Sequence, residues 1–430
     1  MKTLYFFLLV LISSSAFSQL SSYNIADYLY PDVQRKTLML RPIVDFNSSS
    51  SSINGGSVSD FDGSIDLLGS DFMNSRKRQL RLSYNLELGF TARSNNNPSL
   101  LNQDGLYGGA SATLTNRFFF KPKRFFEIDL SGSFGYDNFF RQFTTAVNRN
   151  EITADITIAP KIGFGRLEFV TDAWHAVTIL EELQAAGCLS KDLDHAEITL
   201  LAKKISELQN YRDVDFRLER IYEFEQLATY LVSEGYMDAA NYKSFAILKD
   251  AYDFEGFVTR ENGQQFTAGL LLTYDYLDEN FSAPRTQLSN TIAALVAYER
   301  NKAISVDWQF EQRYELQAGI RRFSPLTTEI VDQSNFIHLS STHTLGYFLS
   351  QRTNFELDLN LRYDLFDINI QSTNNLTIWL SPKYNYYLSP QLRFFANGFL
   401  AVFSTDNVLF VNNSSDISSS LFAGINYFFY

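Results

Sequence analysis

The chain has 430 residues, which is enough for one large domain or for two smaller ones. Its formal net charge of -12 argues against nucleic acid as a partner, because nucleic acids are bound through basic surfaces. The single cysteine, Cys188, excludes an internal disulfide and any multi-cysteine metal site, and we expect no metal and no other cofactor. Aromatic residues make up 15% of the chain, which suits aromatic girdles at two membrane interfaces.

The N-terminus predicts a signal peptide for export over residues 1–18. Lys2 supplies the positive charge, Leu4 to Ile12 forms the apolar core, and Ala16-Phe17-Ser18 is a small-x-small cleavage site. No later segment has the ~18 consecutive apolar residues that a membrane-spanning helix needs. Residues 19–35 are polar with scattered aromatics, and we interpret them as an irregular periplasmic N-terminal segment.

Long stretches of alternating hydrophobicity dominate residues 36–167 and 259–430. In the clearest one, Ala303 to Arg321, every second residue from Ile304 to Ile320 is apolar except Gln312, and the residues between are mostly charged or polar. An outer-membrane strand crosses in ~9–11 residues and alternates lipid-facing with water-facing side chains. We therefore predict a transmembrane antiparallel up-and-down β-barrel. It has 14 strands, or 12 if the strands Lys36–Phe46 and Asp60–Met73 lie outside the wall.

The period changes to that of amphipathic helices between residues 168 and 258. Ile198, Leu201 and Ile205 recur at helical spacing, and Gly187 and Gly235 mark helix ends. We expect an inserted all-α domain of about four helices.

The lengths of the connections predict on which side of the membrane this domain lies. The short links all follow even-numbered strands, at residues 74–76, 121–123, 301–302, 351–352 and 388–390. Longer links follow odd-numbered strands, at residues 94–104, 138–150, 323–333 and 406–415. Outer-membrane barrels have short periplasmic turns and long outer loops, so we expect the helical domain in the periplasm.

The C-terminus ends in a glycine followed by spaced aromatics, Gly424, Tyr427, Phe429 and Tyr430. This pattern resembles the C-terminal signal of outer-membrane barrels. The resemblance implies insertion by the outer-membrane barrel assembly machinery, with outer-membrane lipid as the surroundings. With its Ser/Asn-rich loops and inserted helices, the chain also resembles uncharacterised outer-membrane barrels of Bacteroidota-type bacteria, which implies no activity.

The row of residues predicted to face the lumen is the strongest functional feature. Its acidic members are Glu127, Asp129, Asp307, Glu311, Glu315, Glu356, Asp358 and Asp364, and its basic members are Arg81, Arg313, Arg362 and Arg393. Rings of charge set pore selectivity, so one interpretation is a water-filled path with a mild cation preference. The other interpretation is a lumen closed by acid–base pairs, because wide channels are typical of barrels with 16–18 strands.

Three functions follow from these patterns. We favour a channel or transporter for small polar solutes. The alternative is a closed-barrel scaffold that anchors the helices at 168–258 for docking to a periplasmic protein or the cell wall. The third is a lipid hydrolase, since His338-Leu339-Ser340 resembles the His-x-Ser of outer-membrane phospholipase barrels. Because alternation places His338 and Ser340 in the lumen, we interpret them as polar lumen residues and expect no enzyme.

Overall fold

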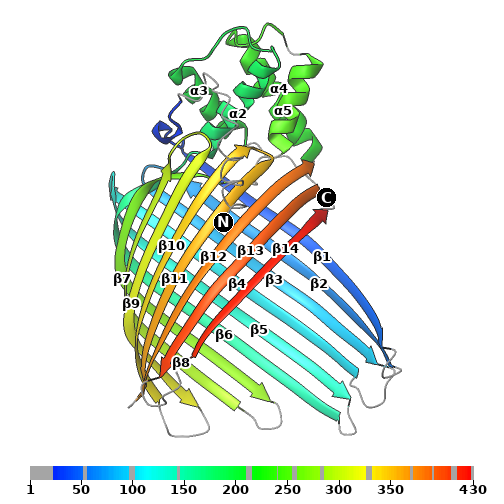
Figure 1. Ribbon diagram of the computed structural model, residues 1–430, viewed down its shortest axis with the longest axis vertical. Coiled ribbons are helices and arrows are strands. Elements are labelled where there is room, and N and C mark those ends of the chain that lie inside the picture. Colours follow the sequence, from blue (N-terminus) through cyan, green and yellow to red (C-terminus); the bar gives the residue numbers. More distant parts are fainter. Residues whose placement is uncertain are drawn as a thin grey trace, which may run out of the picture.

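The computed structural model describes residues 23–51, 56–95, 102–142, 146–209, 216–239, 241–253, 259–280, 285–325, 332–368, 371–389, 392–407 and 414–427. They form one 14-stranded antiparallel sheet with its strands in chain order, which curves into a barrel with the helices gathered at one end (Figure 1). Among the described residues, pairing joins each strand to its neighbours in the sequence and is not found between β1 and β14, so these two form the edges of the sheet.

The first half of the barrel consists of six strands. They are β1 (Val33–Ser51), β2 (Gly56–Asn74), β3 (Arg78–Asn95), β4 (Asn102–Lys121), β5 (Arg124–Gln142) and β6 (Ala146–Phe169). The second half has eight. They are β7 (Glu261–Asn280), β8 (Arg285–Ala303), β9 (Trp308–Pro325), β10 (Asp332–Ser350), β11 (Thr353–Ile368), β12 (Gln371–Ser389), β13 (Leu392–Asn407) and β14 (Ser414–Tyr427). Both β1 and β2 belong to the wall, so the predicted count of 14 is confirmed and the alternative of 12 is wrong.

The helical domain lies between β6 and β7, as predicted. It contains α2 (Thr171–Ala185), α3 (His195–Leu208), α4 (Phe216–Ser233) and α5 (Tyr242–Asp253). Asp194 and Glu197 form a reciprocal capping box at the start of α3. Gly187 and Gly235 follow α2 and α4 with φ of 67° and 70°, the left-handed conformation that favours glycine after a helix. No helix in the described ranges is long and apolar enough to span a membrane.

The strands extend into segments that we expected to be loops. The predicted loop 138–150 is largely strand, because β5 and β6 stay paired up to Gln142 and Ala146. Likewise β1 continues through the serine run to Ser51. Backbone pairing does not require apolar side chains, whereas the alternating pattern ends where the side chains leave the membrane. The hydrophobic pattern therefore located the membrane-spanning part of each strand and missed its polar extension.

The boundary between β8 and β9 also differs from the prediction. The expected link 301–302 belongs to β8, which runs to Ala303, and the turn comprises residues 304–307. In this turn the Ser305 hydroxyl accepts hydrogen bonds from the backbone N–H of Asp307 (3.2 Å) and of Trp308 (3.1 Å). Ile304 and Val306 happen to keep the alternation of β9, which explains the error. Asp307 consequently lies in the turn and not in the lumen row.

The side chains of the barrel divide into two faces, as the alternation predicted. Large apolar side chains point outward, for example Leu88 and Ile162, which are 71% and 66% exposed, and we call this outer surface the lipid face. The polar register faces the concave side, which we call the lumen. The helices mark one end of the barrel, the helix side, and the odd-numbered strands end at the opposite one, the loop side (Figure 1).

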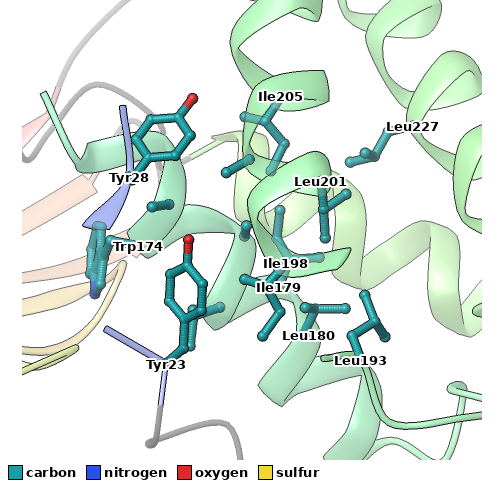
Figure 2. Packing of buried hydrophobic residues seen from close by; sticks show 14 of the residues in the cluster. Tyr23, Tyr28, Trp174, Ile179, Leu180, Leu193, Ile198, Leu201, Ile205 and Leu227 are labelled. Carbon is teal, nitrogen blue, oxygen red and sulfur yellow. The ribbon is translucent and has the colours of Figure 1, made fainter. Parts of the chain in front are cut away.

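One hydrophobic core joins the N-terminal segment, the helices and the barrel. This shared core contains Tyr23, Ile25, Tyr28 and Tyr30 of the N-terminal segment, buried apolar residues of all four helices, and Ala303, Val306 and Phe348 from barrel turns and strand ends. Figure 2 shows Tyr23 and Tyr28 beside Trp174 of α2 and the leucines and isoleucines of α2 and α3. The N-terminal segment, which we expected to be irregular, includes a short 3-10 helix (Ile25–Asp27) and is an integral part of this core.

Two polar residues of α2, His175 and Asp172, lie inside the shared core, each only 3% exposed. Asp172 accepts a hydrogen bond from the buried Ser206 hydroxyl. Burial lowers the pKa of His175 from 6.5 to about 4, and the positive charge of Arg35 acts in the same direction. Burial raises the pKa of Asp172. The helical period alone did not distinguish this buried face of α2 from a solvated one, because α2 is apolar around most of its surface.

The assignment of the two faces predicts an asymmetric response to added charge. Leu359 on the lipid face and Asn360 in the lumen are neighbours on β11. Arginine on the lipid face costs about 2–4 kcal/mol at the bilayer midplane, so Leu359→Arg should lower the yield and stability of folding into lipid vesicles. Asn360→Arg should be much milder, because it lines a polar cavity. Equal damage from both substitutions, measured by urea unfolding, would contradict the assignment of faces.

The burial of His175 predicts acid sensitivity of the helical domain. The unfolded imidazole titrates near pH 6.5 and the folded one near pH 4, so the unfolded state binds more protons between these values. The contribution of His175 to stability should therefore fall as pH falls, by about 2 kcal/mol between pH 7.5 and pH 5. Urea unfolding followed by tryptophan fluorescence checks this, and His175→Gln should flatten the difference. Asp172 acts in the opposite sense, since its contribution is lost as pH rises, so the comparison between variants isolates the histidine.

Candidate functional site

The helix-side mouth of the barrel is narrowed by aromatic side chains. Phe72 of β2 and Phe169 of β6 have ring centroids 5.3 Å apart, although three strands separate them in the sheet. Tyr30 of the N-terminal segment packs against both rings, at 6.4 Å from Phe72 and 5.5 Å from Phe169. Side chains of β2 and β6 therefore meet across this part of the barrel end, with the N-terminal segment laid over them.

Polar contacts reinforce the same closure. Arg166 of β6 donates to Asn74 Oδ1 (2.9 Å) and to the Ser75 carbonyl (3.0 Å) at the turn between β2 and β3. Arg76 in that turn forms an ion pair with Glu168 at 2.8 Å. A guanidinium can donate several hydrogen bonds in one plane, which suits it to join two chain segments. The first half of the barrel is therefore cross-tied at its helix-side end.

The second half is tied to the helical domain through Arg260, which is fully buried just before β7. Its guanidinium donates to the carbonyls of Ser305 (3.0 Å), Trp308 (3.1 Å) and Val306 in and beside the turn between β8 and β9. Its charge also faces the ring of Trp174 on α2 at 5.8 Å. No sequence motif marked this residue, but it holds the barrel turn and α2 in one arrangement.

The turn between β10 and β11 makes the remaining attachment. The Trp174 ring lies 5.9 Å from the ring of Phe348 at the end of β10. Arg352 in the turn donates two hydrogen bonds to the Asp250 carboxylate of α5, one of them at 3.1 Å. Contacts thus reach β2, β6, the start of β7 and the turns after β8 and β10. Because spatial order follows sequence order in this sheet, the N-terminal segment and helices lie over much of the mouth.

Inside the barrel, a paired cluster of charges surrounds Glu127. Glu127 is 1% exposed and bonds both Arg117 and Lys161, the latter at 2.8 Å. Lys161 also bonds Asp129. These residues line a lumen cavity of about 260 Å³. The predicted lumen positions of Glu127 and Asp129 are correct, and both acids have cationic partners.

A second lumen cavity, of about 290 Å³, lies between β9 and β12 next to Phe348. Glu311, Glu356 and Asp358 line it, together with Lys383. Lys383 pairs with Asp358 at 2.6 Å, and Glu311 accepts a hydrogen bond of 2.6 Å from the Gln309 amide. The three predicted acids therefore do converge, around one lysine.

The other predicted lumen residues are also mostly paired. Arg313 pairs with Glu315 at 2.9 Å, Arg362 with Asp364 at 2.7 Å, and Arg81 with Glu261 at 2.5 Å. The guanidinium of Arg393 faces the rings of Tyr387 and Phe395.

The candidate hydrolytic pair does not form a nucleophile–base contact. His338 directs Nδ1 to Asp364 Oδ1 at 2.6 Å, while Ser340 pairs across the sheet with Glu315 and Arg362. Both lie on the lumen face, as predicted.

The C-terminal pattern lies partly within the described residues. Gly424 is in β14 opposite Phe395, whose ring occupies the space that a side chain at position 424 would need. Tyr427 ends β14 opposite Leu392. Phe429 and Tyr430, like the predicted signal peptide at 1–18, lie outside the described residues.

Among the comparisons with known proteins, only the one with solved structures found similar proteins. No protein-family model and no curated protein matches the chain. The chain is similar to the translocator domain of the autotransporter NalP from Neisseria meningitidis, with 7% identity over 80% of this chain and 85% of that one, and a TM-score of 0.30. It is also similar to the beta domain of the Bordetella autotransporter BrkA, with 9% identity over 93% of this chain and 100% of that one, and a TM-score of 0.27. The unliganded ferric citrate transporter FecA gives 8% identity over 93% and 60%, with a TM-score of 0.32. Because these TM-scores are low, the fold assignment depends on the strand order and register of this chain.

The burial of Glu127 between two cations predicts a strong effect of neutralising it. Removing one member of a buried ionic group typically costs about 3–5 kcal/mol, so Glu127→Gln should destabilise the folded barrel by that amount. Glu315→Gln is the matched control, because its partner Arg313 is 60% exposed and such pairs contribute about 0–1 kcal/mol. Urea unfolding in lipid vesicles measures both. Similar small losses in the two variants would mean that the Glu127 cluster is solvated.

Proposed function

We propose that the protein is an outer-membrane barrel with a closed helix-side mouth, which anchors its helical domain in the periplasm as a docking module. The observation that carries this proposal is the shared core, in which the N-terminal segment, all four helices and the barrel rim bury one another's apolar side chains. A domain held in this way has a fixed orientation relative to the membrane. Such an arrangement suits a platform better than a freely moving lid.

The lumen supports the same preference over an open channel. Most of its acids have a cationic partner within the barrel, which reduces the negative charge available to select cations. The two polar cavities, of about 260 and 290 Å³, are small pockets in the lumen, each lined by side chains of the barrel wall. Of the two main interpretations of the sequence, closed scaffold and cation-preferring channel, these contacts favour the scaffold.

The helical domain carries a surface suited to a protein partner. Large apolar side chains are exposed on three helices, namely Leu200 of α3 (53%), Leu218 (46%) and Ile221 (44%) of α4, and Tyr242 (90%) and Phe245 (45%) of α5. Leu218 and Ile221 are three residues apart and so share one face of α4. Exposed apolar patches of this kind commonly mark protein–protein contacts. Docking through this surface is the function that we assign to the domain.

Conductance in planar lipid bilayers tests the closed mouth. The purified full-length protein should insert without producing stable open channels. Trp174→Ala combined with Arg352→Ala removes two attachments of the helical domain, and this variant should show intermittent conductance because the mouth is then loosely covered. Stable, cation-selective conductance of the wild type, weakened by Glu311→Gln with Glu356→Gln, would instead establish the channel.

Cysteine labelling tests the placement of the helical domain. In a Cys188→Ser background, Tyr242→Cys offers a highly exposed thiol on α5 and Asn280→Cys offers one at the loop-side end of β7. A membrane-impermeant maleimide should label position 280 on intact cells. It should reach position 242 only after the outer membrane is broken. Labelling of position 242 on intact cells would place the domain outside the cell.

A further inference from the structure

The lipid face of β10 carries a histidine and a serine where apolar residues are expected. Ser341 and His343 belong to the same register as Leu339, Leu345 and Tyr347, which point into the membrane. The Ser341 hydroxyl and His343 Nε2 lie 2.8 Å apart in a hydrogen bond. Polar groups among lipid tails are costly, and an ionisable residue there is a candidate functional site.

Gln312 on β9 lies directly opposite His343 in the sheet. It is the residue that interrupts the apolar row of β9, and its side chain makes no hydrogen bond within the described part of the chain. The imidazole of His343 is flanked by two aromatic rings, Tyr314 at 5.4 Å and Phe310 at 6.2 Å. By contrast, the facing residues of β11, Leu359 and Leu361, are apolar. Three polar side chains are thus gathered in one place on an otherwise apolar wall.

The row of polar residues continues to two cations on β8. Gln312 pairs across the sheet with Arg300 of β8, and Phe310 pairs with Lys302. Arg300 and Lys302 are exposed on the lipid face and form no ion pair with any residue in the described ranges. Arg300 lies three residues from the helix-side end of β8, whereas His343 lies seven residues from the helix-side end of β10. The row therefore runs from the membrane boundary, where Arg300 and Lys302 can reach water, down to His343 among the acyl chains.

We propose that this row is a binding site for one anionic glycerophospholipid of the leaflet on the helix side. Arg300 and Lys302 bind the phosphate, which is the group at the membrane boundary with complementary charge. The ester carbonyls, which lie deeper than the phosphate in the same molecule, accept hydrogen bonds from the Gln312 amide and from the Ser341–His343 pair, which keeps one donor free after its own hydrogen bond. The chemistry changes along the row in the order in which a glycerophospholipid presents its groups, from charge to hydrogen-bond acceptors to hydrocarbon. Phe310 and Tyr314 provide apolar contacts for the chains.

Native mass spectrometry of the full-length protein, titrated with palmitoyl-oleoyl phosphatidylglycerol, tests the charged end of the site. The wild type should show one tight binding step. Arg300→Gln with Lys302→Gln should weaken this step by about tenfold. The matched control is Arg322→Gln, which removes a lipid-face cation near the loop-side end of β9 and should leave the step unchanged. Equal weakening by the control would overturn the proposal, because it would show non-specific attraction of anionic lipid.

The deeper end is tested with the ether-linked analogue of the same lipid, which lacks both carbonyls. The wild type should bind the ester form about fivefold more tightly than the ether form, as expected for a hydrogen bond or two. His343→Leu and Gln312→Leu should bind the two forms equally. These variants place apolar groups toward lipid, so they should fold at least as well as the wild type, and folded fraction by heat-modified gel mobility checks this. Equal affinity of the wild type for both lipids would overturn the assignment of the carbonyls. Release of lysophospholipid would also contradict a binding role and would make Ser341 and His343 a hydrolytic pair.

Discussion

The burial of α2 and the N-terminal segment against the barrel rim is the interaction on which the rest of the structure depends. Trp174, at 1% exposed, lies where the helices, Arg260 and the end of β10 meet. A four-helix insert between two strands could sit on a flexible tether, but here its core and the core of the rim are continuous. Separating them would expose apolar surface on both sides at about 25 cal/mol per Å² and would leave the Arg260 guanidinium without its carbonyl partners.

The closed mouth that we propose would have consequences for the lumen. Charges near the mouth lose access to bulk water, and an isolated charge in such a place is costly. The pairing of Glu127 with Arg117 and Lys161 follows from this constraint, as does the pairing of Asp358 with Lys383. Under this proposal, the acids of the row serve mainly as partners of the lumen cations. On the lipid face no water solvates a polar side chain, so the polar row from Arg300 to His343 differs from the apolar residues around it.

Much of the fold was predictable because alternation and helical period directly reflect burial. The strand order, the count of 14, the inserted helices and their position on the side of the short turns all follow from such patterns. What could not be predicted depends on contacts distant in the sequence. Arg260 binds carbonyls some 45 residues away, and Tyr30 packs on Phe72 and Phe169. Backbone carbonyls carry no sequence signal, so the buried arginine resembled an ordinary loop residue.

The candidate site shows the same division. The lumen face of Glu127, Glu315 and Asp364 was readable from alternation, but their partners on other strands depended on register. Asp307 was misplaced because the turn kept the phase of the following strand. Gln312 was visible as a break in an apolar row, while its neighbour His343 became significant only when the pairing of β9 and β10 placed the two side by side.

Hydrogen–deuterium exchange of the folded protein in lipid vesicles tests the shared core most directly. If the helical domain is packed onto the rim as one unit, the amides of α2 from Trp174 to Leu183 should be protected to a degree comparable with those of β9 and β10. Trp174→Ala should release α2 while leaving the strands protected. Rapid exchange throughout α2 in the wild type, beside fully protected strands, would contradict the account, because the helices would then be a tethered domain and the mouth would not be held closed.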